Sequence, residues 1–233
     1  MTIQKWGGAA AILQGLTYIF GFVLFFGILD TGGHDTPELF LEFVIQHRDT
    51  YFFGYVVIGV VFSFALMVLV QAMYARLKHE APELMKFAAV VGYMWVFIVM
   101  SSSLIFLTSL NPLATYFEQD PQQALIISRT ITIIVDALGG GIELIGAVWL
   151  LTVSAVGIRS RVFGRPVHYW GIVVGISGVL TLFSGLSFLA TNPLFEVTTA
   201  IFGLGQIVWF LCLGVLMIRA SDRDKTPGSA GFS

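Results

Sequence analysis

Six long apolar runs, separated by short polar connections, form the main pattern of the sequence. They lie near residues 7–29, 51–74, 85–108, 137–158, 167–189 and 196–218. A helix needs roughly 20 apolar residues to cross the hydrocarbon core of a bilayer. Backbone groups in lipid must also be paired within their own segment, which favours helices for runs of this length. The pattern therefore predicts an all-α, polytopic integral membrane protein whose six transmembrane helices form one domain over residues 1–220.

The basic residues are concentrated on one set of connections. Ten of the twelve Lys and Arg residues lie before the first run, in the second-to-third and fourth-to-fifth turns, or after the sixth run. Only Arg48 and Arg129 fall on the other set. By the positive-inside rule, this distribution predicts that both termini are cytoplasmic. The polar residues 221–233 are interpreted as a short disordered cytoplasmic tail.

Two longer connections lie on the predicted external side. In the first, Thr36, Pro37 and Glu38 are typical of a helix start, with a hydroxyl cap, a first-turn proline and an acid at the positive end of the helix dipole. This predicts an amphipathic helix near residues 37–47 that lies on the membrane surface. In the second connection, Pro121 begins another predicted helix. Residues 121–136 either lie on the surface or continue directly into the fourth span.

A similarity between two run ends has two interpretations. Residues 102–113 and 184–194 share Ser, Leu, Phe and Leu, followed by Asn-Pro-Leu. One interpretation is a parallel repeat in which spans 2 and 3 correspond to spans 4 and 5, as in some transporters. The other is that Asn-Pro simply ends a helix wherever a span leaves the lipid.

Composition supports the membrane assignment and narrows the chemistry. The chain has 57% hydrophobic and only 11% charged residues, against about 25% charged in a soluble domain. Its net charge of −2 gives no reason to expect a nucleic-acid partner. The single Cys212 cannot form an intramolecular disulfide. The only metal-like grouping is His34, Asp35, Glu38, Glu42 and His47. Its spacing favours a solvated acidic face, so neither a metal nor a cofactor is expected.

The main candidate site lies around the start of the fourth run, in the stretch RTITIIVDALGGGIELIGAVWLL. On one continuous helix Arg129, Asp136 and Glu143 would share a face, with about 10.5 Å between neighbours. Asp136 is predicted at the membrane interface, and Glu143 about one turn inside. An ionised carboxylate at that depth is unfavourable unless it is paired, protonated or beside a wet cavity. Glu143 is therefore either part of a ligand or ion pathway, or a residue that bonds a neighbouring helix.

The glycines and glutamines within the predicted spans likewise have two interpretations, helix packing or function. Gly139, Gly140 and Gly141 either loosen the helix around a pocket or let another helix approach closely, and Gly175 is assigned to helix packing. Gln14 and Gln206 lie within predicted spans. They either bond across helices or line a polar cavity together with Glu143.

The region that contains these motifs resembles a known family. The glycines at 139–141, the Trp-Leu-Leu at 149–151, the basic Arg-Ser at 159–160 with Pro166, and the glycine-rich 171–178 carry the resemblance, as does the opening WGGAAAILQGLTYI. These features are similar to those of a bacterial six-span membrane protein family, domain of unknown function 4386. The resemblance implies this topology over nearly the whole chain and implies no catalytic residues.

Three classes of function follow from these observations. The first is a non-enzymatic protein of the bacterial cytoplasmic membrane that binds a small apolar or amphipathic ligand, or a partner subunit, near Glu143. The second is a small transporter or channel in which Glu143 exchanges a proton or cation. The third, an intramembrane enzyme, is disfavoured because no nucleophile–base pair or catalytic motif is visible in the sequence.

Overall fold

The computed structural model describes residues 2–29, 36–140, 143–189 and 192–223. These residues form helices and contain no strand, which confirms the all-α prediction. The α-helices are α1 Ile3–Val23, α2 Pro37–Gln46, α3 Arg48–Tyr55, α4 Phe62–Leu77, α5 Pro82–Gln119, α6 Pro121–Val135, α7 Leu144–Ser160, α8 Arg165–Thr181 and α9 Leu194–Arg223. Three segments are π-helical, namely η1 Leu24–Ile28, η2 Val56–Val61 and η3 Asp136–Gly140, and η4 Leu182–Gly185 is a 3₁₀ helix.

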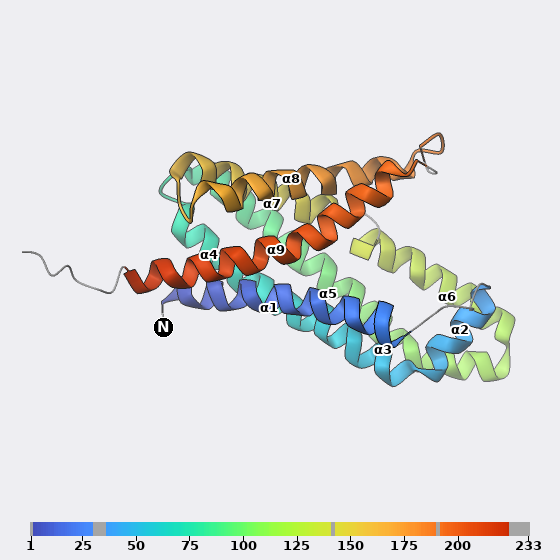
Figure 1. Ribbon diagram of the computed structural model, residues 1–233. Coiled ribbons are helices and arrows are strands. Elements are labelled where there is room, and N and C mark those ends of the chain that lie inside the picture. Colours follow the sequence, from blue (N-terminus) through green and yellow to red (C-terminus); the bar gives the residue numbers. More distant parts are fainter. Residues whose placement is uncertain (1, 30–35, 141–142, 190–191, 224–233) are drawn as a thin grey trace, which may run out of the picture.

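Six of these helices form a closed ring through their contacts, and Figure 1 shows the bundle from the side. In order around the ring, α1 contacts α4, α4 contacts α5, α5 contacts α7, α7 contacts α8, α8 contacts α9, and α9 returns to α1. A single buried cluster fills the centre and takes residues from all six helices. Because each helix packs against two neighbours and this common core, the six helices form one unit.

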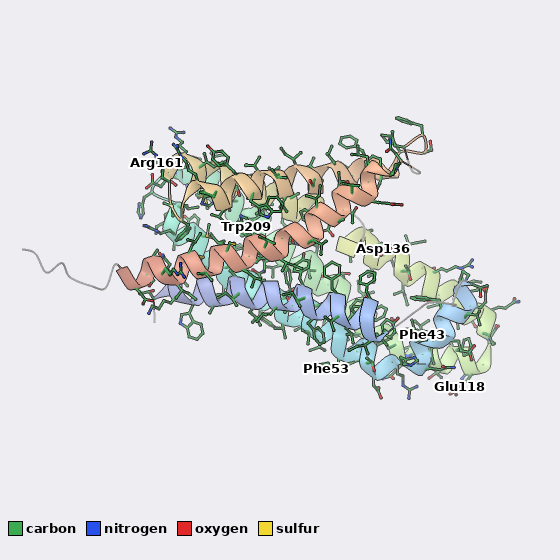
Figure 2. The ribbon with its side chains drawn as sticks, viewed as in Figure 1. Phe43, Phe53, Glu118, Asp136, Arg161 and Trp209 are labelled. Carbon is green, nitrogen blue, oxygen red and sulfur yellow. The ribbon has the colours of Figure 1, made fainter. Side chains whose placement is uncertain are left out.

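Aromatic side chains make up the middle of that core. Trp149 is 5.8 Å from Trp209 and 5.9 Å from Trp95, measured between ring centroids. Phe62 lies 5.7 Å from Trp95 in an edge-to-face arrangement, a geometry that aromatic rings favour. Trp209 is fully buried and is labelled at the centre of the bundle in Figure 2. The tryptophans of the spans therefore serve packing more than the membrane interface, although Trp6 and Trp170 are exposed.

The lengths and compositions of the helices identify a multi-pass membrane protein. Five described helices are long and apolar enough to cross a membrane, and a sixth apolar helix is shorter. The five are Ile3–Ile28, Arg48–Leu77, Pro82–Gln119, Arg165–Gly185 and Leu194–Asp222, and the shorter one is Leu144–Ser160. Large apolar side chains also cover the outside of the ring, such as Phe97 with 69% and Val90 with 60% of its surface exposed. A bilayer is the solvent that such a surface requires.

The third apolar run differs from its prediction at its outer end. The sequence predicted a span that ends near residue 108, but α5 continues to Gln119 with Pro112 inside the helix. Pro112 has no N–H to donate, yet helix interiors in membrane proteins tolerate proline when neighbouring groups compensate. The second Asn-Pro pair, at residues 192–193, comes directly before α9 instead. The two Asn-Pro-Leu motifs thus have different local structures, so the shared letters alone give no support for a repeat.

The segment after α5 folds back against it. Asp120 caps α6 by accepting hydrogen bonds from the N–H groups of Gln122 and Gln123, at 3.0 and 3.1 Å. α6 then packs along the outer part of α5, and α2 lies beside α6 (Figure 1). Thr36 caps α2 through a 3.3 Å hydrogen bond from the N–H of Leu39. In the segment 121–136, residues 121–135 therefore form α6 on α5 and Asp136 begins the π-helical η3, and the described residues do not make one α-helix with α7.

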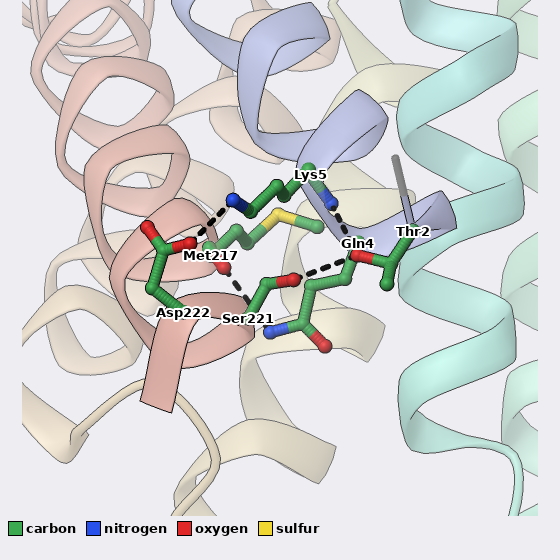
Figure 3. Close-up of polar contacts among 6 residues, drawn as sticks. All are labelled: Thr2, Gln4, Lys5, Met217, Ser221 and Asp222. Carbon is green, nitrogen blue, oxygen red and sulfur yellow. Dashed lines mark hydrogen bonds and ion pairs between the residues drawn. The ribbon is translucent and has the colours of Figure 1, made fainter. Parts of the chain in front are cut away.

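The ends of α1 and α9 meet at the opposite end of the bundle (Figure 3). Three contacts join them: the Thr2 and Ser221 hydroxyls at 2.7 Å, a hydrogen bond of 3.2 Å from the Gln4 amide to the Met217 carbonyl, and an ion pair between Lys5 and Asp222. Arg161, in the turn between α7 and α8, lies at this same end (Figure 2). Basic residues therefore gather where the described chain begins and ends.

Candidate functional site

A cavity of about 470 Å³ lies inside the ring, on the side of the aromatic core away from Arg161. Its walls come from α1 with η1, from the Arg48–Leu77 helix, from α5, and from the junction between α6 and α7. Small-molecule sites in proteins typically occupy about 300–1,000 Å³ and have mostly apolar walls with a few polar groups. The cavity has this size and this kind of lining.

Aromatic rings dominate the wall. Seven of the sixteen lining residues are aromatic: Tyr18, Phe22, Phe25, Phe26, Tyr55, Phe62 and Trp95. Several of them also contact one another. Tyr18 meets Phe62 edge-to-face at 5.5 Å, and Phe25 meets Tyr55 at 5.8 Å. Because Phe62 and Trp95 belong to both the wall and the core, the cavity borders the buried core of the ring.

Two carboxylates lie in this wall. Asp136 is exposed at the start of η3, and Glu143 is half-buried directly before α7. Both line the cavity, whose described lining contains no Lys, Arg or His. Within the described residues neither carboxylate takes part in an ion pair. The polar part of the described cavity lining is therefore acidic and includes no basic side chain.

Three π-helical segments surround the cavity. Phe25 and Phe26 come from η1, Ile58 comes from η2 and Asp136 comes from η3. A π-helical turn contains an extra residue, is rare, and frequently occurs at functional sites. Each π segment widens its helix and redirects the side chains next to it. The concentration of all three around one cavity is a structural reason to consider it the functional site.

Hydrogen bonds from neighbouring helices fix the two acid-bearing segments. The Ser102 hydroxyl on α5 donates to the Val135 carbonyl at 3.1 Å, which satisfies one of the free carbonyls at the end of α6. On the other side, the N–H of Glu143 donates to the Thr181 hydroxyl of α8 at 3.3 Å. Thr181 in turn donates to the Gly178 carbonyl at 2.7 Å. The end of α6 at Val135 and the backbone of Glu143 are thus held to the ring by hydrogen bonds that do not involve the two carboxylates.

Comparison with known proteins identifies the family. A family model described as a domain of unknown function, DUF4386, matches residues 8–215. The chain belongs to the DUF4386 family. This confirms the resemblance found in the sequence, and the match includes most of each of the six ring helices. No curated protein and no solved structure matches the chain significantly.

The residues that the sequence singled out in this DUF4386 protein fall into two groups. Asp136 and Glu143 line one cavity, although the described residues do not place them on one continuous α-helix. Arg129 does not line it and lies on α6, with its guanidinium 4.0 Å from the Glu38 carboxylate on α2. Figure 2 shows Asp136 at the end of α6 nearest the ring. The predicted acidic and basic residues therefore do not form one charged face.

The two glutamines are buried but are not in the described cavity wall. Gln14 on α1 and Gln206 on α9 are 0% and 1% exposed, and their amides have no hydrogen-bond partner within the described residues. Gln14 lies one turn before Thr17 and Tyr18, which do line the cavity. Unsatisfied buried amides are uncommon in proteins, so both side chains remain candidates for a functional role beside the cavity.

The predicted glycines have different surroundings. Gly139 and Gly140 belong to η3, whereas Gly141 lies outside the described residues. A Cβ at Gly175 would lie 2.5 Å from Leu151 Cγ and 3.2 Å from the Ala147 carbonyl oxygen, so α8 approaches α7 closely there. Close approach at small residues is the usual way that membrane helices pack.

Sequence reasoning missed the aromatic part of the DUF4386 cavity. Tyr18, Phe22, Phe25, Tyr55 and Trp95 appeared only as members of apolar runs. Spacing gave a partial signal, since Tyr18, Phe22, Phe25 and Phe26 recur at intervals of three and four and thus share one helix face. Nothing in the pattern indicated that this face would line a cavity instead of facing lipid.

Proposed function

We propose that this protein is a non-enzymatic, six-span membrane protein that binds a small amphipathic ligand in the cavity beside Glu143. The observation that carries the proposal is the joint presence of two uncompensated carboxylates and an aromatic wall around about 470 Å³ of space. Binding is favoured over catalysis because the described polar lining consists of carboxylates and hydroxyls without an adjacent nucleophile–base pair.

The position of α7 in the ring supports six membrane spans instead of five. α7 has 17 residues, which rise about 25 Å, close to the hydrocarbon thickness of about 30 Å. It packs between α5 and α8 and contributes Trp149 to the common core. A helix in this position crosses the same thickness of membrane as its neighbours.

Charge supports the orientation. The basic end of the bundle, with Lys5 and Arg161, is proposed to be cytoplasmic, in a bacterial inner membrane. The cavity then lies in the outer half of the membrane. A ligand would enter from the outer leaflet or the external side, where the exposed Asp136 carboxylate can remain hydrated.

Cavity filling tests the proposal. The protein in nanodiscs is photolabelled with an apolar alkyl diazirine, and labelled peptides are quantified by mass spectrometry. Val99 lines the cavity from α5, so Val99→Trp should reduce labelling of the α1 and α5 wall residues several-fold. Val90→Trp is the matched control, because Val90 is 60% exposed on the same helix and does not line the cavity. Equal wall labelling in both variants would refute ligand binding here.

A second candidate function is a proton- or cation-coupled transporter that uses Glu143. The observation that favours it is a group of buried polar side chains without hydrogen-bond partners in the described structure: Gln14, Ser63, Ser154 and Gln206. All four lie on ring helices, and with water between them they would extend a polar route from the cavity toward the basic end.

Proton flux separates the two candidates. In vesicles that contain a trapped pH-sensitive dye, an imposed membrane potential should drive protons faster with the protein than without it. Glu143→Gln should abolish this excess, whereas Glu118→Gln, an exposed acid far from the cavity (Figure 2), should retain it. The transporter candidate fails if the protein adds no flux, or if Glu143→Gln conducts like the unaltered protein.

A further inference from the structure

The chemistry of the cavity identifies a class of ligand. We propose that it selects an organic cation, a molecule with an amine or quaternary ammonium group attached to an apolar body. This inference rests on the proposed function, since it names what the same site binds.

The first argument is charge. Asp136 and Glu143 both line the cavity, and none of the described lining residues is basic. Placing a charge in a partly desolvated site is unfavourable unless it is paired. A cationic ligand relieves this cost for the carboxylates and for itself, whereas an anionic ligand would increase it. The protein supplies the negative partner, and the ligand would supply the positive one.

The second argument is the aromatic wall. The face of an aromatic ring attracts a cation within about 6 Å, most strongly for Trp and Tyr, and aromatic cages are a recurring site for quaternary ammonium groups. Tyr18, Tyr55 and Trp95 all line the cavity, together with four phenylalanines. The rings therefore suit both parts of such a ligand, since they attract the charged group and pack against the apolar body.

The third argument separates an organic cation from a metal ion. Hard metal ions such as Ca²⁺ require six to eight oxygen ligands. The described residues contain no group of three or more His, Cys, Asp or Glu side chains placed to hold a metal. The lining around the two cavity acids is largely apolar. A hydrated metal ion would not contact such a surface favourably, whereas an alkyl chain would.

The layout also orients the ligand. The acids come from the junction between α6 and α7, and the Tyr18–Phe62–Trp95 group closes the cavity against the core. A ligand would thus direct its cationic group toward Asp136 and Glu143 and its apolar body toward Phe62 and Trp95, which also belong to the core. The exposure of Asp136 allows water to reach the charged end.

Competition against the diazirine label tests the inference. The protein is placed in phosphatidylcholine nanodiscs, and three competitors with the same ten-carbon chain are compared: decyltrimethylammonium, decanol and decyl sulfate. The cation should protect the cavity wall at about tenfold lower concentration than decanol. This factor is expected if each part-exposed carboxylate contributes roughly threefold. Decyl sulfate should protect least.

Variants of the acids show which groups recognise the charge. Asp136→Asn and Glu143→Gln should each reduce the preference for the cation about threefold, and the double variant should remove it, with decanol protection unchanged. Glu118→Gln should behave as the unaltered protein. Unchanged decanol protection also shows that each variant is folded. Because the same competitors are compared in every variant, differences in their partitioning into lipid cancel between variants.

The outcomes distinguish the inference from the proposed function. If decanol and the cation protect equally, or if the preference for the cation persists in the double variant, the inference is wrong while ligand binding stands. If no competitor protects the cavity wall, the proposed function itself fails.

Discussion

A close contact beside the cavity allows a quantitative test of the fold. Gly59 lies in the π-helical segment η2, next to Ser103 of α5. A Cβ built at Gly59 would overlap both the Oγ and the Cβ of Ser103, whereas the Ser103 Cα would lie 3.7 Å away, in ordinary contact. Because Cβ is fixed to the backbone, rotation of the hydroxyl cannot relieve the overlap. Gly59→Ala must therefore move η2 away from α5.

The expected energies follow from these contacts. Overpacking of a well-packed interior lowers the free energy of unfolding by about 1–3 kcal/mol. Replacement of a helical glycine by alanine raises it by up to about 1 kcal/mol. Gly59→Ala should thus lower the free energy of unfolding by about 1–2 kcal/mol. Ser103→Gly should lower it by about 0.5 kcal/mol through helix propensity. The double variant exchanges the two side chains, so it should be within about 1 kcal/mol of the unaltered protein, a coupling of about 2 kcal/mol.

Reversible unfolding in mixed micelles provides the assay. The protein is titrated with sodium dodecyl sulfate, and unfolding is followed by the fluorescence of its buried tryptophans. Gly27→Ala is the matched control, since Gly27 lies in the π-helical η1 and a Cβ there would meet no atom within 4 Å. Through helix propensity alone it should raise the free energy of unfolding by up to about 1 kcal/mol. The reasoning is refuted if Gly59→Ala is as stable as this control, or if Ser103→Gly fails to compensate it.

Three further predictions concern topology, the core and the ends of the bundle. In a Cys212→Ser background, an impermeant maleimide should label Glu118→Cys on intact cells and Arg161→Cys only after permeabilisation, and the reverse pattern would invert the orientation. Trp149→Ala should lower the free energy of unfolding by about 3–5 kcal/mol in the same micelle titration, because its side chain is 1% exposed at the centre of the core. Asp222→Asn should lower the free energy of unfolding by less than about 1 kcal/mol, since that carboxylate is 57% exposed and surface ion pairs contribute little. A larger loss of stability would mean that the contact between α1 and α9 controls folding.

The hydrophobic pattern predicted the helical architecture because lipid leaves a chain few alternatives. The run 51–74 lies within the helix Arg48–Leu77, and the run 196–218 lies within Leu194–Asp222. The outer end of α5 was not predicted, because Asn-Pro is read as a helix end in isolation. In the folded protein α6 packs along that part of α5, and this tertiary contact supports a helix that the local sequence disfavours.

The candidate site was predicted only in part. Asp136 and Glu143 were singled out because carboxylates are rare in apolar runs, and both line the cavity. Arg129 was grouped with them on the assumption of one continuous helix, but its guanidinium lies near Glu38 instead. The aromatic wall could not be predicted, because a phenylalanine that lines a cavity and one that faces lipid have the same local sequence pattern.

The π-helical segments connect these observations. Lipid-exposed helices gain nothing from widened turns, which weaken hydrogen-bond geometry, so regular α-helix is the expected form throughout a span. In this chain, however, η1, η2 and η3 each interrupt or extend an α-helix, and each contributes a residue to the same cavity wall. Departures from the locally preferred structure concentrate at functional sites, where surrounding contacts hold them in place. The Ser102 hydrogen bond to Val135 and the tight Gly59–Ser103 contact are such contacts. The same α5 turn therefore holds both η2 and the acid-bearing η3, and disturbing it should alter the stability of the bundle and the shape of the cavity together.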